Sequence, residues 1–559
     1  MVSSKSYSSS REPNKVEKKI AIIGAGISGL LACKHTMEKG FNPVVFEARN
    51  GIGGVWSSTI DSTKLQTPKD HFQFSDFPWP KSVSQTFPDH NQVMEYVTSY
   101  ALRFDIFSRI KFNSKVIGLD YIYSSSDDDD NMCSNWDMWG GNGEAFSSNG
   151  KWNVVVQNVL QPMEAPKVYQ VDFVTLCIGK FSDLPNIPDF PISKGANKFN
   201  GEIIHSMDYA AMDKIQAAKF IKNKRVSVVG FQKSALDIAA EIAKNNGVTN
   251  PCTLVFRRVQ WSGSENLVRF TFTNLNRFSE LMVHKPGEGL FLWFLAVLLS
   301  PLVIALPLKH IYLIALDILQ MRRIVPQMDL SVEKYEMVPQ HSFLKQICSC
   351  MFMVLPQQFY DRVKEGSLVL QKSRVLGFYE NGLILDNVVA AHLETDIVIL
   401  ATGYKSDAKI ANIFTSIDFK KCILGSSAPF YRECIHPRIP QLAIMGYSES
   451  PATLFTFELR SKWIAHFLAG KFRLPPIREM EENVEKWEKN ARRYSRENYK
   501  RACVGVMLQI HCNDQLCKDM GCNPRRKKWL FLSFILLITL QTMQIYETFL
   551  HNPHVLAKI

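Results

Sequence analysis

The first residues with a recognisable chemical use lie near the start of the chain and read Gly24-Ala25-Gly26-Ile27-Ser28-Gly29. In this spacing the first glycine permits a tight turn, the second lets the backbone approach a pyrophosphate, and the third lets a helix pack close to a strand. Amide groups at the start of that helix favour a phosphate. Glu47 follows at the distance expected of an acid that binds a ribose 2′-hydroxyl. Because a carboxylate repels a 2′-phosphate, this site is predicted to bind FAD or NAD rather than NADP.

A second glycine-rich segment follows Glu47 and reads Gly51-Ile52-Gly53-Gly54-Val55-Trp56. Glycine lets a backbone approach a ligand closely, and a long dinucleotide needs a further approach of this kind beside the first turn. We therefore expect FAD at this site, with Gly54, Val55 and Trp56 among its contacts. The alternative is an ordinary loop.

A third glycine turn reads Gly230-Phe231-Gln232-Lys233-Ser234-Ala235. Gln232 takes the place of the middle glycine of the usual pattern, and Ala235 takes the place of the third. Arg257 and Arg258 end the next predicted strand, where an acid would otherwise contact NAD. Two guanidinium groups suit a 2′-phosphate through charge-assisted hydrogen bonds, so this turn is predicted to bind NADPH. The alternative is a pair of solvated arginines.

Two dinucleotide sites with opposite charge preferences predict hydride transfer from NADPH to FAD. The twelve cysteines include no CxxC pair. A disulfide reductase is therefore not expected, and the cysteines are interpreted as reduced thiols. No metal site is predicted, because no zinc motif has the spacing of His511, Cys512, Cys517 and Cys522.

A nucleotide-binding turn must lie between a buried strand and a helix, and the sequence predicts both around each site. The first unit has a strand at 19–23, a helix to about residue 39 and a strand at 43–47; the second has a strand at 226–229, a helix to about 243 and a strand at 253–256. Further strands are predicted at 152–157, 170–178 and 395–400. The predicted fold class is α/β, with two Rossmann-type dinucleotide-binding domains.

One further segment distinguishes among flavin enzymes and reads Phe199-Asn200-Gly201-Glu202-Ile203-Ile204-His205-Ser206-Met207-Asp208-Tyr209. It resembles the fingerprint of the class B flavin monooxygenases, FxGxxxHxxx followed by an aromatic residue. The Baeyer–Villiger branch ends this pattern in Trp-Pro, whereas Tyr209-Ala210 resembles the flavin-containing monooxygenases that oxidise nitrogen and sulfur.

The resemblance runs from about Lys18 to Lys528 and includes Ala401-Thr402-Gly403-Tyr404 and Met445-Gly446-Tyr447. It looks most like the plant flavin-containing monooxygenases, in which Gly230-Phe231-Gln232-Lys233-Ser234 and Asp76-Phe77-Pro78-Trp79-Pro80 also occur.

This resemblance implies that an NADPH domain interrupts a split FAD domain. It also implies a set of residues at the domain junction: Phe199, Gly201, His205, Tyr209, Thr402 and Gly403. For His205 we favour orienting a linker or contacting NADP over direct acid–base chemistry. Many relatives place an Asn over the flavin, three residues before the Lys that matches Lys69. Gln66 occupies that position here, and its amide makes it the candidate catalytic residue.

The resemblance also implies a reaction. NADPH reduces FAD, oxygen forms a C4a-hydroperoxyflavin, and a nucleophilic nitrogen or sulfur takes the terminal oxygen. The expected partners are O2 and a small amine, imino acid or thioether. Two alternatives are an NADPH oxidase that produces hydrogen peroxide and a low-turnover, membrane-tethered redox flavoprotein.

The predicted domain organisation has five parts. They are a polar leader at 1–17, the first part of the FAD domain at 18–198, the NADPH domain at 199–391, the second part of the FAD domain at 392–528 and an apolar tail at 529–559. Residues 124–150 include four consecutive aspartates and many Ser, Asn and Gly residues, so we expect a disordered, exposed insertion there.

The net charge of +12 over 559 residues indicates attraction to anions. Nucleic acid is not an expected partner because no motif supports it, and a membrane surface is left open. Gly289 to Leu308 contains 20 residues without a charge, but Pro301 and Pro307 favour a buried or membrane-touching hairpin over a span.

The basic residues Arg525 to Lys528 precede the apolar tail, which is interpreted either as a C-terminal anchor or as a segment that packs on the body. The polar N-terminus shows no secretory signal. We therefore expect a protein on the cytoplasmic side, including association with the endoplasmic reticulum membrane, and not a secreted one.

Overall fold

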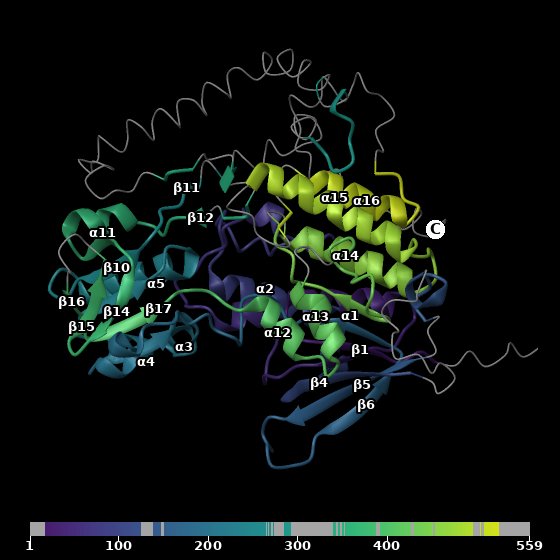
Figure 1. The fold of residues 1–559 in the computed structure, drawn as a ribbon, viewed down its shortest axis with the longest axis horizontal. Helices are drawn as coiled ribbons and strands as arrows, with labels where there is room; N and C mark the ends of the chain where they lie inside the picture. Colours follow the sequence, from purple (N-terminus) through teal and green to yellow (C-terminus); the bar gives the residue numbers. More distant parts are fainter. Residues whose placement is uncertain are drawn as a thin grey trace, which may run out of the picture.

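The fold has two lobes, each built around a parallel sheet (Figure 1). The computed structural model describes residues 17–123, 138–146, 150–263, 284–291, 339–341, 353–386, 392–425, 430–450, 453–495, 503–504 and 508–524, and also residues 265, 268, 269, 272, 294, 345, 346 and 349–351.

The first sheet has five parallel strands in the order β18 (Leu442–Ile444), β7 (Phe173–Leu176), β1 (Ile20–Ile23), β2 (Val44–Phe46) and β3 (Ile110–Lys111). Helix α1 (Ile27–Glu38) follows β1 directly and packs against α14 (Thr453–Leu468). The strand–turn–helix–strand unit predicted around the first glycine turn is therefore confirmed. All four residues of β1 are buried, which explains why its sequence is apolar throughout.

The second sheet is also parallel, in the order β13 (Leu368–Lys372), β10 (Cys252–Phe256), β9 (Val226–Val229), β17 (Ile397–Leu400) and β8 (Glu202–His205). Helix α5 (Lys233–Asn246) follows β9, as predicted. The predicted domain boundary between residues 391 and 392 is wrong, because β17 pairs with both β8 and β9. The second unit therefore extends through Leu400.

The remaining strands of the described residues form two antiparallel sheets and one parallel pair. One contains β4 (Ser114–Ile122), β5 (Lys151–Asn158) and β6 (Lys167–Val171), and another contains β14 (Val375–Tyr379), β15 (Gly382–Leu385) and β16 (His392–Glu394). The short parallel strands β11 (Ser262–Gly263) and β12 (Met353–Val354) pair with each other. The other described α-helices are α2 (His90–Arg103), α3 (Ser206–Ala210), α4 (Lys214–Ile221), α11 (Phe359–Glu365), α12 (Ser406–Asn412), α13 (Ile417–Gly425), α15 (Ile477–Ser495) and α16 (Gln509–Asp519).

Two sequence expectations within the first unit are corrected. The single strand predicted at 170–178 is divided at Asp172, whose carboxylate accepts a hydrogen bond from the Lys19 amide at 2.8 Å, so its halves belong to β6 and β7. The expectation of an exposed insertion at 124–150 is wrong for its second half. Residues 138–146 pack on the body, where Trp139 is fully buried and donates its indole N–H to the carbonyl of Ile439 at 3.1 Å. Residues 124–137 lie outside the described residues.

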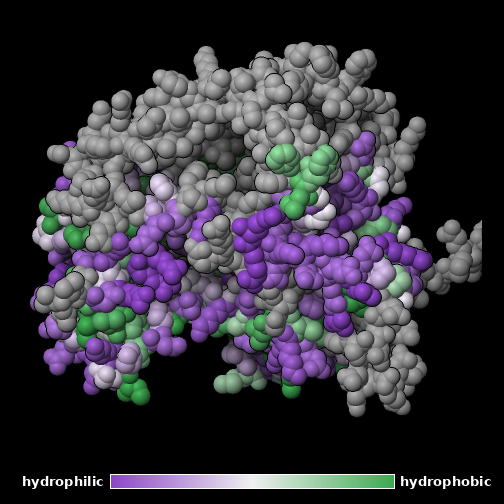
Figure 2. All heavy atoms as spheres, turned by 45° about the horizontal axis from the view of Figure 1, so that its top comes forward, coloured by the Kyte–Doolittle hydropathy of each residue, from purple (hydrophilic) through white to green (hydrophobic). Residues whose placement is uncertain are grey.

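Both apolar segments singled out in the sequence lie mainly outside the described residues, including all of the tail at 529–559. In the part of the chain that the structure describes, no helix has the length and apolar character needed to span a membrane. Among the described residues on the face shown in Figure 2, hydrophilic ones predominate, with a few apolar groups among them. Leu290 and Phe291, at the start of the first apolar segment, are both exposed.

Candidate functional site

The first glycine turn has the geometry that its sequence predicts. Gly24 has a φ of +102°, and its amide donates to the carbonyl of Phe46 at 2.8 Å, which joins the turn to β2. A Cβ atom on Gly29 would lie 1.9 Å from the Gly24 carbonyl oxygen. Gly29 therefore lets α1 pack close against β1. The first amides of α1 are directed past the turn.

A second glycine backbone faces the first turn. Gly53 donates its amide to the carbonyl of Ala25 at 3.0 Å, and a short 3-10 helix begins at Gly54. A Cβ atom on Gly26 would lie 3.5 Å from the Cα of Gly54. Side chains at these two positions would narrow the space between the turns, so their absence leaves a cradle for a ligand that lies against the backbone.

Glu47 lies at the end of β2 with its carboxylate fixed by backbone amides. One oxygen accepts from the Ala25 amide at 2.6 Å and the other from the Arg49 amide at 3.0 Å. A carboxylate has about four acceptor positions, so each oxygen can still accept a bond from a ribose hydroxyl. The group is thus oriented and still able to bind.

These groups open into one cavity of about 1030 Å³. Of the residues predicted to bind FAD or act beside it, the cavity is lined by Gly24, Gly26, Ile27, Ser28, Glu47, Gly54, Val55, Trp56 and Gln66. Ala25 and Gly29 lie behind this lining and support it through the contacts described above. The cradle, the oriented acid and the size of the cavity together fit FAD.

Gln66 lies in the wall of the same cavity. Its side-chain carbonyl oxygen accepts a hydrogen bond from the Val354 amide at 3.0 Å. This bond fixes the Gln66 side chain against β12. Its NH2 group makes no hydrogen bond among the described residues and is left to donate to a bound molecule. The arrangement is compatible with the predicted role without testing it.

The third glycine turn, Gly230 to Ala235 at the start of α5, does not line this cavity. Gly230 has a φ of +143°, and a Cβ atom there would lie 2.4 Å from the Ala401 carbonyl oxygen, so the position requires glycine. Phe231 and Ala235 are buried in the core of the second unit, so their side chains serve packing rather than a ligand. Gln232 and Ser234 are exposed.

Lys233, the first residue of α5, forms an ion pair with Asp237 at 2.6 Å. Asp237 is buried, and burial raises the pKa of its carboxyl although Lys233 and a hydrogen bond from Thr63 oppose this. The Lys233 ammonium is therefore held along the helix. Arg257 and Arg258 are both exposed just beyond the end of β10, the position predicted for contact with a 2′-phosphate.

The junction residues meet where two connecting segments run side by side. The Asn186 amide donates to the Gly403 carbonyl at 2.8 Å, and the Thr402 hydroxyl donates to the Asn186 carbonyl at 2.5 Å. Gly403 has a φ of +85°, which favours glycine. These contacts join the segment that leaves the first unit to the segment that returns to it.

Both ring nitrogens of His205 are engaged at this junction. Nδ1 accepts from the Met207 amide at 3.2 Å, and Nε2 lies 3.1 Å from the Gly403 carbonyl oxygen, so Nε2 must carry the proton. Burial lowers the pKa of His205, although the bond to Gly403 opposes this shift. Both ring nitrogens are thus engaged at the linker, a geometry compatible with the orienting role that we favoured, which stays a prediction.

The other junction residues have packing roles. Tyr209 is fully buried, and its hydroxyl donates to Glu241 at 3.1 Å. Phe199 is buried among the residues between the second sheet and its antiparallel neighbour. A Cβ atom on Gly201 would lie 2.3 Å from the Asp396 carbonyl oxygen, which explains the glycine.

Sequence reasoning missed several charged residues that line the cavity. Lys180 and Glu449 form an ion pair at 2.8 Å although 269 residues separate them. Lys409 also lines the cavity and pairs with Asp183 at 2.7 Å, and burial lowers the pKa of its ammonium. Of these residues, only Arg49 could have been found from the sequence, because it lies two residues after Glu47.

The interpretation of all cysteines as reduced thiols is wrong. Cys350 and Cys503 form a disulfide across a sequence separation of 153 residues, and Cys350 lines the cavity. The argument against a redox cysteine pair near the flavin therefore fails. No CxxC spacing could have revealed it, because the two cysteines are brought together by the tertiary fold.

The comparisons with known proteins agree with this geometry. The chain matches the family model described as FMO-like, flavin-binding monooxygenase-like, over residues 17–280 and 310–538. It is 36% identical over 522 residues to a protein of Arabidopsis thaliana named Probable flavin-containing monooxygenase 1, covering 91% of this chain and 93% of that protein.

Solved structures share the fold at lower identity. The S-allyl-L-cysteine S-oxygenase from Allium sativum has a TM-score of 0.54 and 16% identity, covering 93% of this chain and 92% of that one. A crystal structure of OTEMO in complex with FAD and NADP has a TM-score of 0.59 and 15% identity, covering 90% and 98%. At these identities the likeness concerns the fold, an α/β architecture with two Rossmann-type units.

Proposed function

The chain belongs to the flavin-binding monooxygenase-like family, and from this premise we propose that it oxygenates a nucleophilic nitrogen or sulfur of a small amine, imino acid or thioether. It is an oxidoreductase that uses FAD, NADPH and O2. The oxygen-transfer route expected from the sequence is part of this proposal.

One observation carries the proposal: a single cavity joins the glycine cradle to Gln66 and to the Lys180–Glu449 ion pair. The cradle and Glu47 suit the nucleotide end of FAD, and Gln66 lies in the part of the wall reached by β12. A substrate can therefore share one cavity with the reactive part of the cofactor.

The chain's own residues bind, orient and exclude water. Amides at the start of α1 bind the pyrophosphate, and Glu47 accepts from the ribose. When bound and reduced, FAD supplies the electrons that activate O2 for transfer of one oxygen atom. The Gln66 NH2 group donates to the oxygen that is transferred, and the apolar side chains of Phe272 and Phe457 in the cavity wall exclude water from it.

The test is oxygen transfer by the purified, FAD-loaded full chain. With NADPH and 18O2, we expect one labelled oxygen atom in the product of at least one amine, imino acid or thioether, measured by mass spectrometry. Because Lys180 and Glu449 place opposite charges in the cavity wall, the panel compares zwitterionic substrates with uncharged ones. Hydrogen peroxide without any oxygenated product would contradict the proposal and support the NADPH oxidase alternative.

A matched pair of variants ties the activity to the cradle. Gly26→Val adds a side chain beside Gly54, so FAD should bind more than roughly tenfold more weakly and oxygenation should be lost. Gly51→Ala is the control, because a Cβ atom on Gly51 meets no atom within 4 Å and the residue does not line the cavity. Unchanged FAD affinity in Gly26→Val would contradict the assignment of the cradle.

A further inference from the structure

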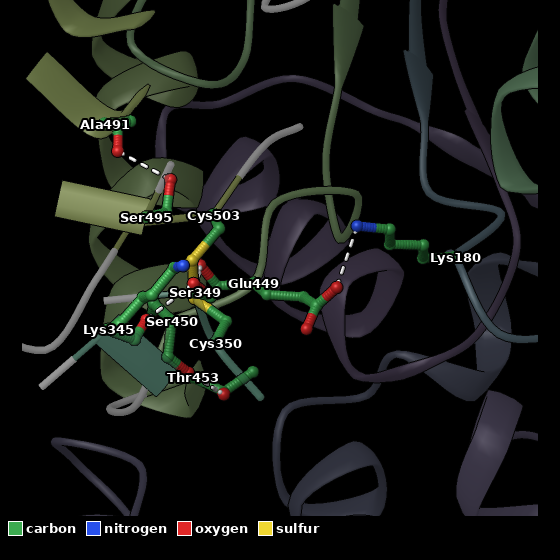
Figure 3. Close-up of a disulfide and its surroundings, with 10 residues drawn as sticks. All are labelled: Lys180, Lys345, Ser349, Cys350, Glu449, Ser450, Thr453, Ala491, Ser495 and Cys503. Atoms are coloured by element: carbon green, nitrogen blue, oxygen red, sulfur yellow. Dashed lines mark hydrogen bonds and ion pairs between the residues drawn. A yellow bond between two sulfur atoms is a disulfide. The ribbon is translucent and has the colours of Figure 1, made fainter. Parts of the chain in front are cut away.

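The disulfide joins two segments that are 153 residues apart in the sequence (Figure 3). Cys350 belongs to a turn that precedes β12. The backbone of Cys503 forms an isolated parallel β-bridge with that of Glu449. Cys350, Glu449 and Lys180 all line the cavity. Cys350 is therefore part of the wall that surrounds the proposed flavin and substrate, and the disulfide joins Cys503 to it.

The turn that carries Cys350 is organised around one buried glutamine. The Gln346 carbonyl accepts from the Ser349 amide at 3.0 Å, and its side-chain NH2 donates to the Met351 carbonyl at 3.1 Å. These two bonds lie within the turn, and further bonds between the Gln346 side chain and the Trp261 backbone hold the turn to that segment. They fix its shape but do not attach it to the opposite side of the wall.

The opposite side is centred on Glu449. Its carbonyl accepts from the Val504 amide at 2.9 Å, and its carboxylate pairs with Lys180 at 2.8 Å, as Figure 3 shows for the ion pair. The Cys350 sulfur lies 3.9 Å from the Glu449 carbonyl oxygen, a weak contact. The covalent bond to Cys503 thus links the turn to this side.

The accessibility of the pair differs from that of most other cysteines. Cys350 and Cys503 are both half-buried, and Cys350 faces the cavity. By contrast, Cys33 and Cys434 are fully buried thiols, and burial raises the pKa of each to about 12. A thiol needs its thiolate form to react, so these buried groups are inert, whereas the half-buried disulfide beside the cavity is the better candidate for exchange.

We propose that Cys350–Cys503 is a reversible thiol–disulfide site for a dithiol reductant, and that its reduction opens the cavity wall between the Cys350 turn and Glu449. The proposal concerns the state of the wall and does not depend on which substrate is oxygenated. Reduction leaves the Gln346 turn intact but releases it from the Glu449 side.

The exchange balances in two steps. A thiolate of the reductant attacks one sulfur, the Cys350–Cys503 bond breaks, and the displaced thiolate takes a proton while a mixed disulfide forms. The second thiol of the reductant then attacks the mixed disulfide and releases the second protein thiol. The reductant is oxidised to its own disulfide, and the protein gains two electrons and two protons.

The experiment uses the FAD-loaded full chain purified without reductant, with dithiothreitol as the probe. Alkylation under denaturing conditions and peptide mass spectrometry should show Cys350 and Cys503 paired before treatment and two additional thiols, one at each, after it. Iodide quenching of bound FAD fluorescence should rise by roughly twofold or more on reduction, because a wall segment that opens locally exposes what it covers. Diamide should restore both signals.

Variants separate the pair from general effects of the reductant. Cys503→Ser should show the higher quenching without dithiothreitol and no response to it, whereas Cys422→Ser, a change at a half-buried cysteine outside the disulfide, should behave as the unchanged chain. Thiols at Cys350 and Cys503 in the untreated protein would overturn the proposal. Equal quenching of the oxidised and reduced forms would overturn it as well. Both readouts need only bound FAD, so they remain decisive if no oxygenated product is found.

Discussion

Single charged residues distinguish the two nucleotide sites. Glu47 is held by two backbone amides beside the first turn, so a carboxylate is fixed where a ribose would bind. Arg257 and Arg258 are exposed at the end of β10, and neither forms an ion pair with an acidic side chain in the described part of the chain. We therefore propose that the first site binds a ribose with free hydroxyls and that the two arginines at the second site bind a phosphate.

Removing both arginine side chains should weaken the binding of NADPH specifically. A hydrogen bond to a charged group contributes about 1.5–3 kcal/mol, so Arg257→Ala combined with Arg258→Ala should raise the KM for NADPH by roughly tenfold to a hundredfold. The KM for NADH should change little, since NADH has no 2′-phosphate. Steady-state kinetics with both nucleotides measures the difference. Arg478→Ala on α15, where the side chain is 91% exposed, is the control, and equal changes for NADPH and NADH would contradict the assignment.

At the scale of elements, α14 fastens the loop that contains the Asp76-Phe77-Pro78 motif. Glu458 on α14 is buried, accepts from the Ser75 amide at 2.9 Å and pairs with Lys462 at 2.8 Å. Asp76 pairs with Lys34 of α1. The motif thus links α1 and α14, the two helices that pack against each other beside the first sheet.

The charge of Glu458 makes this link sensitive to acid. Burial pushes its pKa upward, but Lys462, His35 and the Ser75 hydroxyl outweigh burial and hold the pKa at about 2, below the ordinary 4.5. A carboxyl with a lowered pKa contributes stability above its unfolded pKa, and the contribution is lost as the pH falls from 4.5 towards 2. At neutral pH, Glu458→Gln should therefore cost roughly 1–3 kcal/mol of unfolding free energy.

Urea unfolding at several pH values measures this effect. The difference between the unchanged chain and Glu458→Gln should shrink as the pH falls below about 4.5, because the native carboxyl then loses its charge. Glu482→Gln on the exposed face of α15 is the control and should change stability little at any pH. A difference that stays constant with pH would show that the charge of Glu458 is not what stabilises the link.

At the scale of the whole molecule, the features predicted correctly are those specified locally. The turn at Gly24 and the turn at Gly230 each lie between a buried strand and a helix, and all of these residues are neighbours in sequence. The placement of β17 in the second sheet and the burial of Trp139 depend on partners far along the chain. The Cys350–Cys503 pair is of the same kind, with 153 residues between its members. Composition around Trp139 even favoured exposure, because its neighbours are polar.

The two units themselves are joined by a small polar contact that sequence could not reveal. The Thr63 hydroxyl in the first unit donates to Asp237 of α5 at 2.9 Å, and the Ser62 hydroxyl donates to Glu241 at 2.5 Å. Asp237 is buried, so loss of a hydrogen bond there leaves a polar oxygen with one partner fewer. This contact therefore helps fix the second unit against the loop that precedes Gln66.

Thr63→Val should weaken the contact between the two units without changing the shape of the side chain. The lost hydrogen bond should cost about 1 kcal/mol, and amides of α5 near Asp237 should exchange hydrogen faster while those of β1 do not. Hydrogen exchange followed by mass spectrometry measures both regions. Thr415→Val removes a comparable bond to Asp120 at 2.8 Å within the first unit, and it should leave exchange in α5 unchanged. If both variants accelerate exchange equally in α5 and β1, the effect is global, and the Thr63–Asp237 bond does not specifically hold the two units together.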